Sequence, residues 1–125
     1  MRLENLDDLQ YSIEMSILNN YLSCWMLDNK VYAEIMEIKV DEKLFTRTTT
    51  NKAVARAIRI YQDKDHPLDE LIIKEFLDSK MKVNDFQYQE ILSRGVLPLS
   101  HFKHYLKLLE DKITNDIRKD SLARI

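Results

Sequence analysis

The chain has 125 residues, of which 45% are hydrophobic and 32% are charged, and its formal net charge is -2. This length is enough for one hydrophobic core and too short for two, so we expect a single domain over residues 1–125. The charge is unlike that of a dedicated nucleic-acid-binding domain, and no apolar run approaches the roughly 18 residues of a membrane span. We therefore expect a cytoplasmic protein that acts through contacts with other proteins.

Gly95 is the only glycine, and Pro67 and Pro98 are the only prolines. Phosphate-binding loops, tight hairpins and nucleophile elbows need glycine where the backbone takes a positive φ. The composition therefore predicts an all-α fold, a compact bundle of about six helices with a longer C-terminal helix. It excludes a phosphate-loop ATPase site within these residues, and we expect no catalytic residue and no cofactor. Cys24 is the only cysteine, so we expect a buried, reduced thiol.

The first predicted helix starts near Asn5 and runs to about Cys24. Its apolar residues form two adjacent stripes, namely Leu6, Leu9, Ile13, Ile17 and Tyr21, and Tyr11, Met15, Leu18, Leu22 and Trp25. The strip predicted to face water contains Asp8, Ser12, Ser16, Asn19 and Ser23. A helix that is apolar over more than half its girth needs neighbours on two sides, so we place it at the centre of the bundle.

The middle of the chain carries several helix-start signals. Asp28 or Asn29 opens a second helix, and residues 40–45 form a short helical turn that presents Leu44 and Phe45. One of Thr48, Thr49 and Thr50 caps a third helix, which ends near Gln62 and carries the apolar residues Val54, Ala57, Ile58 and Tyr61. These signals predict short connections between helices rather than long loops.

Two further helices are predicted before the last one. Asp69 caps a helix with the apolar residues Leu71, Ile72, Ile73, Phe76 and Leu77. Asn84 and Gln87 form a capping-box pattern that opens the next helix, whose apolar residues are Phe86, Tyr88, Ile91 and Leu92. We expect this helix to end at Gly95 with a glycine cap.

Pro98 and Ser100 start the last helix, predicted over residues 100–119 after a helical head over residues 1–99. Its apolar positions are Phe102, Tyr105, Leu106, Leu109, Ile113 and Ile117. Two interpretations stay open: the helix lies back on the bundle, or it projects and packs its distal apolar residues against another helix or subunit. These six residues are our candidate protein interface, and the second interpretation predicts self-association.

Other side chains are candidates for specific roles. Glu14 falls inside the apolar arc of the first helix, where it either forms an ion pair that fixes a neighbouring helix or partner, or snorkels at the core edge. Lys52, Arg56 and Arg59 form a basic face on the third helix, which meets an acidic partner or is simply solvated. The solvated face is the more common case.

His101 and His104 lie one helical turn apart and could share a metal ion. No cysteine and no clear third ligand accompanies them in the sequence, so a solvated helix start is the favoured interpretation. We therefore predict no metal site.

The order of these signals resembles the N-terminal domain of DnaB-type replicative helicases over roughly residues 9–119. The matching segments are Ile13-Glu14-Met15-Ser16-Ile17-Leu18, Asp41-Glu42-Lys43-Leu44-Phe45, Asn51-Lys52-Ala53-Val54 to Tyr61, His66-Pro67-Leu68-Asp69 to Phe76-Leu77, and Phe102 with Tyr105. Asn19 stands where the family usually has glycine, Val83-Asn84-Asp85 replaces a stretch that usually contains glycine, and Arg118 lies slightly beyond the expected arginine position. These departures point to a divergent bacterial or phage member.

The resemblance implies a compact helical head followed by a helical hairpin, of which the last helix here would be the first arm. In that family the domains pair through their hairpins and build a collar on the hexameric ring, where primase docks. The ATP- and magnesium-dependent motor lies in a separate C-terminal domain, and DNA is engaged only by the complete ring. The resemblance thus implies a non-catalytic domain that supports hexamer assembly and recruits primase or a helicase loader.

Two alternatives remain at this point. The C-terminal helicase-binding domain of a primase resembles this fold and is also an all-α contact module, although the Pro67-Leu68-Asp69 unit and Phe45 favour the helicase. A small helical enzyme with acid and base side chains is the alternative from another class. It would require a deep pocket that contains Glu14, His101 or His104.

Overall fold

The computed structural model describes the backbone of residues 3–123 and the side chains of residues 9–112. Within residues 3–123 there are six α-helices and two short 3₁₀ turns, without a strand. In chain order these are α1 (Leu3–Ser23), η1 (Cys24–Met26), α2 (Asn29–Glu37), η2 (Glu42–Leu44), α3 (Thr49–Asp63), α4 (Glu70–Lys80), α5 (Asp85–Leu92) and α6 (Leu99–Ala123). The prediction of an all-α helical bundle is confirmed.

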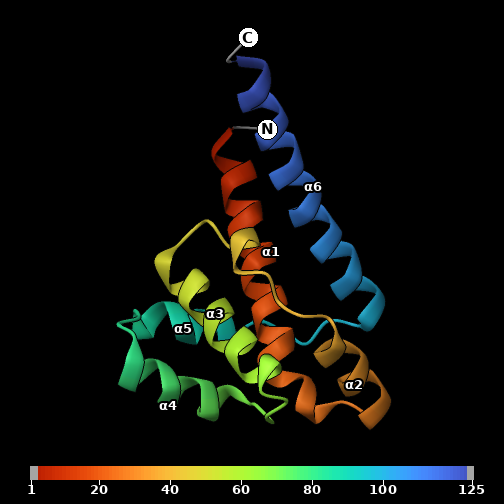
Figure 1. Ribbon diagram of the computed structural model, residues 1–125, viewed down its shortest axis with the longest axis vertical. Coiled ribbons are helices and arrows are strands. Elements are labelled where there is room, and N and C mark those ends of the chain that lie inside the picture. Colours follow the sequence, from red (N-terminus) through yellow and green to blue (C-terminus); the bar gives the residue numbers. More distant parts are fainter. Residues whose placement is uncertain (1–2, 124–125) are drawn as a thin grey trace.

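Helix α1 is the central element of the bundle. It contacts α3, α4, α5 and α6, while α2, α3, α4 and α5 gather around its C-terminal half (Figure 1). Helix α6 runs alongside α1 and continues past it, so that both ends of the chain lie on the same side of the molecule (Figure 1). The two apolar stripes of α1 explain this position, because a helix with apolar surface on two sides needs partners on both.

Large aromatic side chains fill the core between these helices. Tyr21 of α1 meets Phe102 of α6 edge to face, with ring centroids 5.2 Å apart, and both rings are buried. The buried phenol of Tyr21 donates a hydrogen bond to the carbonyl of Ile38 at 2.8 Å. The core therefore joins α1 to α6 while its buried hydroxyl stays satisfied. Cys24 is also buried as a free thiol, and this burial raises its pKa to about 12.

The starts of α2, α3, α4 and α5 follow the sequence signals closely. In each case a side chain just before the helix accepts a hydrogen bond from a backbone N–H in the first turn, which satisfies a donor that the helix itself leaves open. The capping residues are Asp28 for α2, Thr48 for α3, Asp69 for α4 and Asn84 for α5. These four predictions are confirmed.

The helix end predicted at Gly95 is wrong, because α5 ends earlier and no described glycine has a positive φ. The left-handed residue is instead Asp65, with φ of 51°, after α3. Its N–H donates to the carbonyl of Gln62 at 3.0 Å, and the N–H of His66 donates to the carbonyl of Tyr61 at 3.0 Å. This is a Schellman motif, and the edge-to-face contact of Tyr61 with His66 at 5.2 Å supplies its side-chain contact.

Several apolar residues predicted for the core lie on the surface. Leu9, Leu71 and Phe86 are exposed, with Phe86 at 75%. Trp25 is also exposed because α1 ends before it, so the helical spacing no longer applies, and its indole N–H donates to a carboxylate oxygen of Glu70 at 2.9 Å. The apolar spacing thus predicted the helices correctly, but it did not predict which apolar residues near the helix ends are buried.

Helix α6 begins directly after Pro98, whose carbonyl accepts a hydrogen bond from the N–H of Phe102 at 3.0 Å. The helix has 25 residues and extends beyond the predicted interval 100–119 at both ends. Among the helices that the structure describes, none combines the length and apolar character needed to cross a lipid bilayer.

Candidate functional site

Glu14 fastens the connection between η2 and α3 to α1. Its carboxylate, 0% exposed, accepts hydrogen bonds from the side-chain amides of Gln10 at 2.8 Å and Asn51 at 3.1 Å. The backbone N–H groups of Thr46 and Arg47 donate to it at 3.3 and 3.4 Å. One side chain of α1 therefore satisfies polar groups from both the connection and the first turn of α3.

Burial raises the pKa of Glu14 above its usual value, and the four hydrogen bonds oppose the shift only in part. The two backbone bonds are long, which explains why the loss of hydration dominates. The side-chain oxygen of Asn51 is buried without a hydrogen-bond partner beside this carboxylate. The snorkelling interpretation of Glu14 is wrong, because the side chain does not reach solvent.

A second cluster fastens the connection between α5 and α6 to the opposite side of α1. Asn20 accepts from the N–H of Leu97 at 2.8 Å and donates to its carbonyl at 3.0 Å, while Asn19 donates to the carbonyl of Arg94. The guanidinium of Arg94 donates to the hydroxyl of Ser12 at 2.8 Å. These contacts position the start of α6 against α1.

This cluster corrects the prediction that the polar strip of α1 faces water. Asn19 and Ser23 are buried, because the backbone of the connection before α6 needs hydrogen-bond partners and lies on this strip. Asn20 was missed by the sequence analysis, although its spacing from Ile13 and Ile17 on one helical face indicates burial.

The candidate interface residues of α6 have different environments. Phe102, Leu106 and Leu109 are buried against the rest of the chain, so these three belong to its own core rather than to a surface open to a partner. Tyr105 is half-buried against this core. Ile113 and Ile117 lie outside the residues whose side chains are described. The part of α6 nearest the head thus lies back on the bundle, and the predicted contact with a second chain stays a prediction for the distal residues.

The basic face of α3 is exposed but partly neutralised by neighbouring carboxylates. Arg56 pairs with Glu42 at 2.9 Å, and Arg59 pairs with Asp63 at 2.9 Å. Lys52, the third residue of this face, is exposed. Two of the three cations therefore pair with carboxylates of η2 or of the C-terminal end of α3, and contact of this face with an acidic partner stays a prediction.

His101 and His104 are both exposed at the start of α6. Within the part of the chain that the structure describes, no group of three or more histidine, cysteine or acidic residues is arranged to hold a metal ion. The two imidazoles therefore have no third ligand among these residues.

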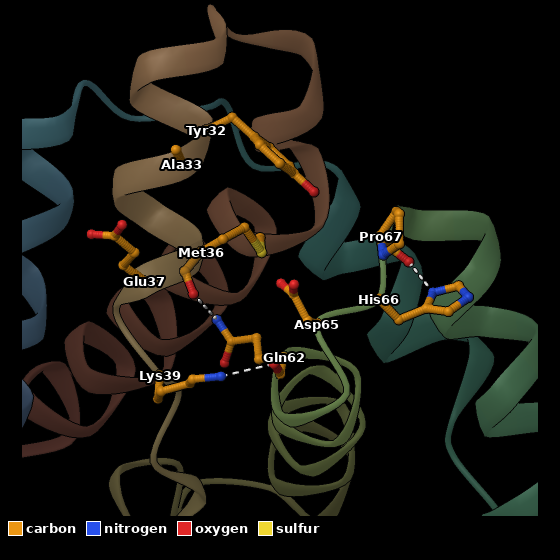
Figure 2. A pocket seen from close by; sticks show the side chains of 9 residues that line it. All are labelled: Tyr32, Ala33, Met36, Glu37, Lys39, Gln62, Asp65, His66 and Pro67. Atoms are coloured by element: carbon orange, nitrogen blue, oxygen red, sulfur yellow. Dashed lines mark hydrogen bonds between the residues drawn. The ribbon is translucent and has the colours of Figure 1, made fainter.

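An open groove of about 540 Å³ lies between the C-terminal ends of α2 and α3 (Figure 2). Its lining residues are Tyr32, Ala33, Met36, Glu37, Lys39, Gln62, Asp65, His66 and Pro67. Glu14, His101 and His104, the residues considered for acid or base chemistry, do not line it. The groove is therefore not a pocket around those three side chains.

Gln62 joins the two walls of this groove. Its side-chain oxygen accepts from the N–H of Val40 at 2.9 Å, and its amide donates to the carbonyl of Ile38 at 3.2 Å. Gln62 was predicted only as a helix end, although its spacing from Val54 and Ile58 indicates the buried face of α3, where it lies. A polar residue at helical spacing from apolar core residues indicates a buried side chain that forms hydrogen bonds.

Comparison with known proteins adds the family. Searches of curated proteins and of solved structures found no match. The model of the family described as "DnaB-like helicase N terminal domain" matches residues 9–111, which is most of the chain. The matched segment includes the two clusters that fasten the connections to α1, and it reaches into α6. The chain therefore belongs to the family of DnaB-like helicase N-terminal domains, which are non-catalytic helical domains.

Proposed function

We propose that this chain is the N-terminal interaction domain of a replicative DNA helicase, in which it supports assembly of the hexameric collar and recruits primase or a helicase loader. The observation that carries the proposal is the family match over residues 9–111. ATP and magnesium would then belong to a separate motor domain, and DNA would be bound by the complete ring.

The shape of the chain supports a role in assembly. Helix α6 has 25 residues, which corresponds to about 37 Å at the usual rise of an α-helix. Its first turns pack on the head through Phe102 and Leu106, whereas the helix continues past the head in Figure 1. A long helix that leaves its head is suited to pairing with a second helix.

The test uses the complete product of the gene that encodes this chain. We expect that product to form hexamers in native mass spectrometry and to unwind DNA with ATP. Deletion of residues 1–125 should weaken the hexamer and abolish primase binding while ATP hydrolysis persists. A gene product without a motor domain, or a deletion that leaves both assembly and primase binding unchanged, would contradict the proposal.

The same experiment separates the primase alternative. A helicase head should bind purified primase from the same genome, whereas the C-terminal domain of a primase should bind purified helicase. The family match favours the first outcome.

A further inference from the structure

The groove between α2 and α3 has an apolar floor and negatively polarised walls. Met36 and the ring of Tyr32 supply apolar surface, and Figure 2 shows the Tyr32 ring directed across the groove towards Pro67. Both α2 and α3 end at this groove, with Glu37 and Asp63 as their last residues. Since the C-terminal end of a helix carries partial negative charge, two such ends favour a positive group between them.

Asp65 adds a full negative charge to this place. Its carboxylate points towards Met36 and Tyr32 (Figure 2), and it forms no ion pair or hydrogen bond with another described side chain. Glycine or asparagine is the usual residue in the left-handed position that Asp65 occupies. Burial is the main cause that raises the pKa of the Tyr32 phenol, and the electrostatic effects of Cys24 and then of Asp65 raise it further.

The cations around the groove do not neutralise Asp65. The ammonium of Lys39 donates to the carbonyl of Gln62 at 2.7 Å and lies 3.7 Å from the carboxylate of Asp63. The ring of His66 points away from the groove, and its Nδ1 donates to the carbonyl of Pro67 at 2.6 Å. Glu37, exposed on the α2 side, adds a second negative charge at the rim.

We propose that this groove binds an arginine side chain presented by another protein. The guanidinium would stack on Tyr32 and pair with Asp65, while its aliphatic stem would cover Met36. The proposal goes beyond the role in helicase assembly and does not depend on it, because it rests only on the chemistry of the groove.

The test is an NMR titration of the isotope-labelled 125-residue chain with the peptide acetyl-Leu-Arg-Leu-amide. The matched peptide carries citrulline in place of arginine, which keeps the shape but removes the charge. We expect saturable shifts of the backbone amides of Lys39, Asp65 and His66, with binding at least about fivefold weaker for the citrulline peptide. Equal affinity for the two peptides, or shifts located elsewhere, would overturn the proposal.

Variants of the chain make the test specific. Asp65→Asn removes the charge but keeps a residue that tolerates the left-handed backbone, so the fold should persist while the affinity falls about threefold or more. Tyr32→Leu should also weaken binding, whereas Glu75→Gln, on the exposed face of α4, should not. Unchanged affinity in Asp65→Asn would refute the assignment. Shifts that depend on the concentration of the chain alone, without displacement by peptide, would identify a contact between copies and would also refute it.

Discussion

The connection before α3 and the connection before α6 are both fastened to α1, but by different chemistry. The first depends on one buried carboxylate, Glu14, which accepts four hydrogen bonds. The second is held by neutral amides, chiefly Asn20, which both donates and accepts. At the first connection one titratable carboxylate accepts all four hydrogen bonds, so their strength depends on pH. At the second connection the hydrogen bonds are shared among amide side chains, which do not titrate.

The largest effect expected from this difference is that of Glu14→Ala. It leaves the buried amide of Asn51 and the backbone donors of the connection without an acceptor, and Gln10 keeps only its bond to the Thr46 hydroxyl, so we expect the free energy of unfolding to fall by about 3–5 kcal/mol. Urea unfolding followed by circular dichroism measures the change. Glu75→Ala, on an exposed face of α4, is the control and should cost less than about 0.5 kcal/mol. A loss for Glu14→Ala no larger than in this control would show that the carboxylate is dispensable.

Asn20→Ala should have a smaller effect, since it removes two hydrogen bonds and leaves two backbone groups of Leu97 unsatisfied. We expect a loss of about 2 kcal/mol. Hydrogen exchange at the Leu97 amide should accelerate in this variant while exchange within α3 follows only the global stability. Unchanged protection of that amide would argue against the proposed fastening of α6.

The pH dependence separates the two kinds of fastening. Because the folded pKa of Glu14 is raised above its unfolded value near 4.5, the folded chain holds this proton more tightly. The stability that Glu14 contributes is present below the unfolded pKa and is lost as pH rises through the folded pKa. The free energy of unfolding of the native chain should therefore fall relative to that of Glu14→Gln as pH rises, by about 1.4 kcal/mol for each pH unit between the two pKa values.

The matched measurement uses Asn20→Ala over the same pH series. The difference in free energy of unfolding between Asn20→Ala and the native chain should stay constant with pH, because neither Asn20 nor Leu97 titrates. If the difference changed with pH in the same way for Asn20→Ala and for Glu14→Gln, a group other than Glu14 would be the cause.

The smallest expected effect is that of Ser12→Ala, which removes the hydroxyl that accepts from Arg94. We expect a loss of about 0.5–1 kcal/mol in thermal or urea unfolding. Ser16→Ala on the same helix is the control and should be neutral or slightly stabilising, since alanine is the better helix former. Equal effects of the two substitutions would remove Ser12 from the cluster.

The parts of the fold that depend on local signals could be predicted from the sequence. Asp28, Thr48 and Asp69 cap helices because each needs only the first turn that follows it. The central position of α1 followed from its two apolar stripes. The burial of other residues depends on tertiary contacts that local signals do not show. Asn19 is buried because its side-chain amide donates to the carbonyl of Arg94, far along the chain. Leu71 is exposed because nothing among the described residues covers it.

The groove between α2 and α3 could not be predicted from the sequence either, because it also depends on tertiary contacts. The left-handed backbone was expected at the only glycine, yet it occurs at Asp65, because Asp tolerates this conformation and the contact of Tyr61 with His66 supports the helix end. No pattern in the sequence shows that α2 ends beside Asp65. The end of α3 is joined to the segment after α2 by the hydrogen bonds of the Gln62 side chain with Val40 and Ile38.

The attachment of the connection before α6 to the C-terminal end of α1 has a mechanical consequence. A load applied along the far end of α6 would act on a helix that the bundle holds in two ways, by the hydrogen bonds between Asn20 and Leu97 and by the burial of Phe102, Leu106 and Leu109. The load would therefore be passed to α1 at the centre of the bundle. Movements of whatever α6 joins would thus be felt by the head as a rigid tilt.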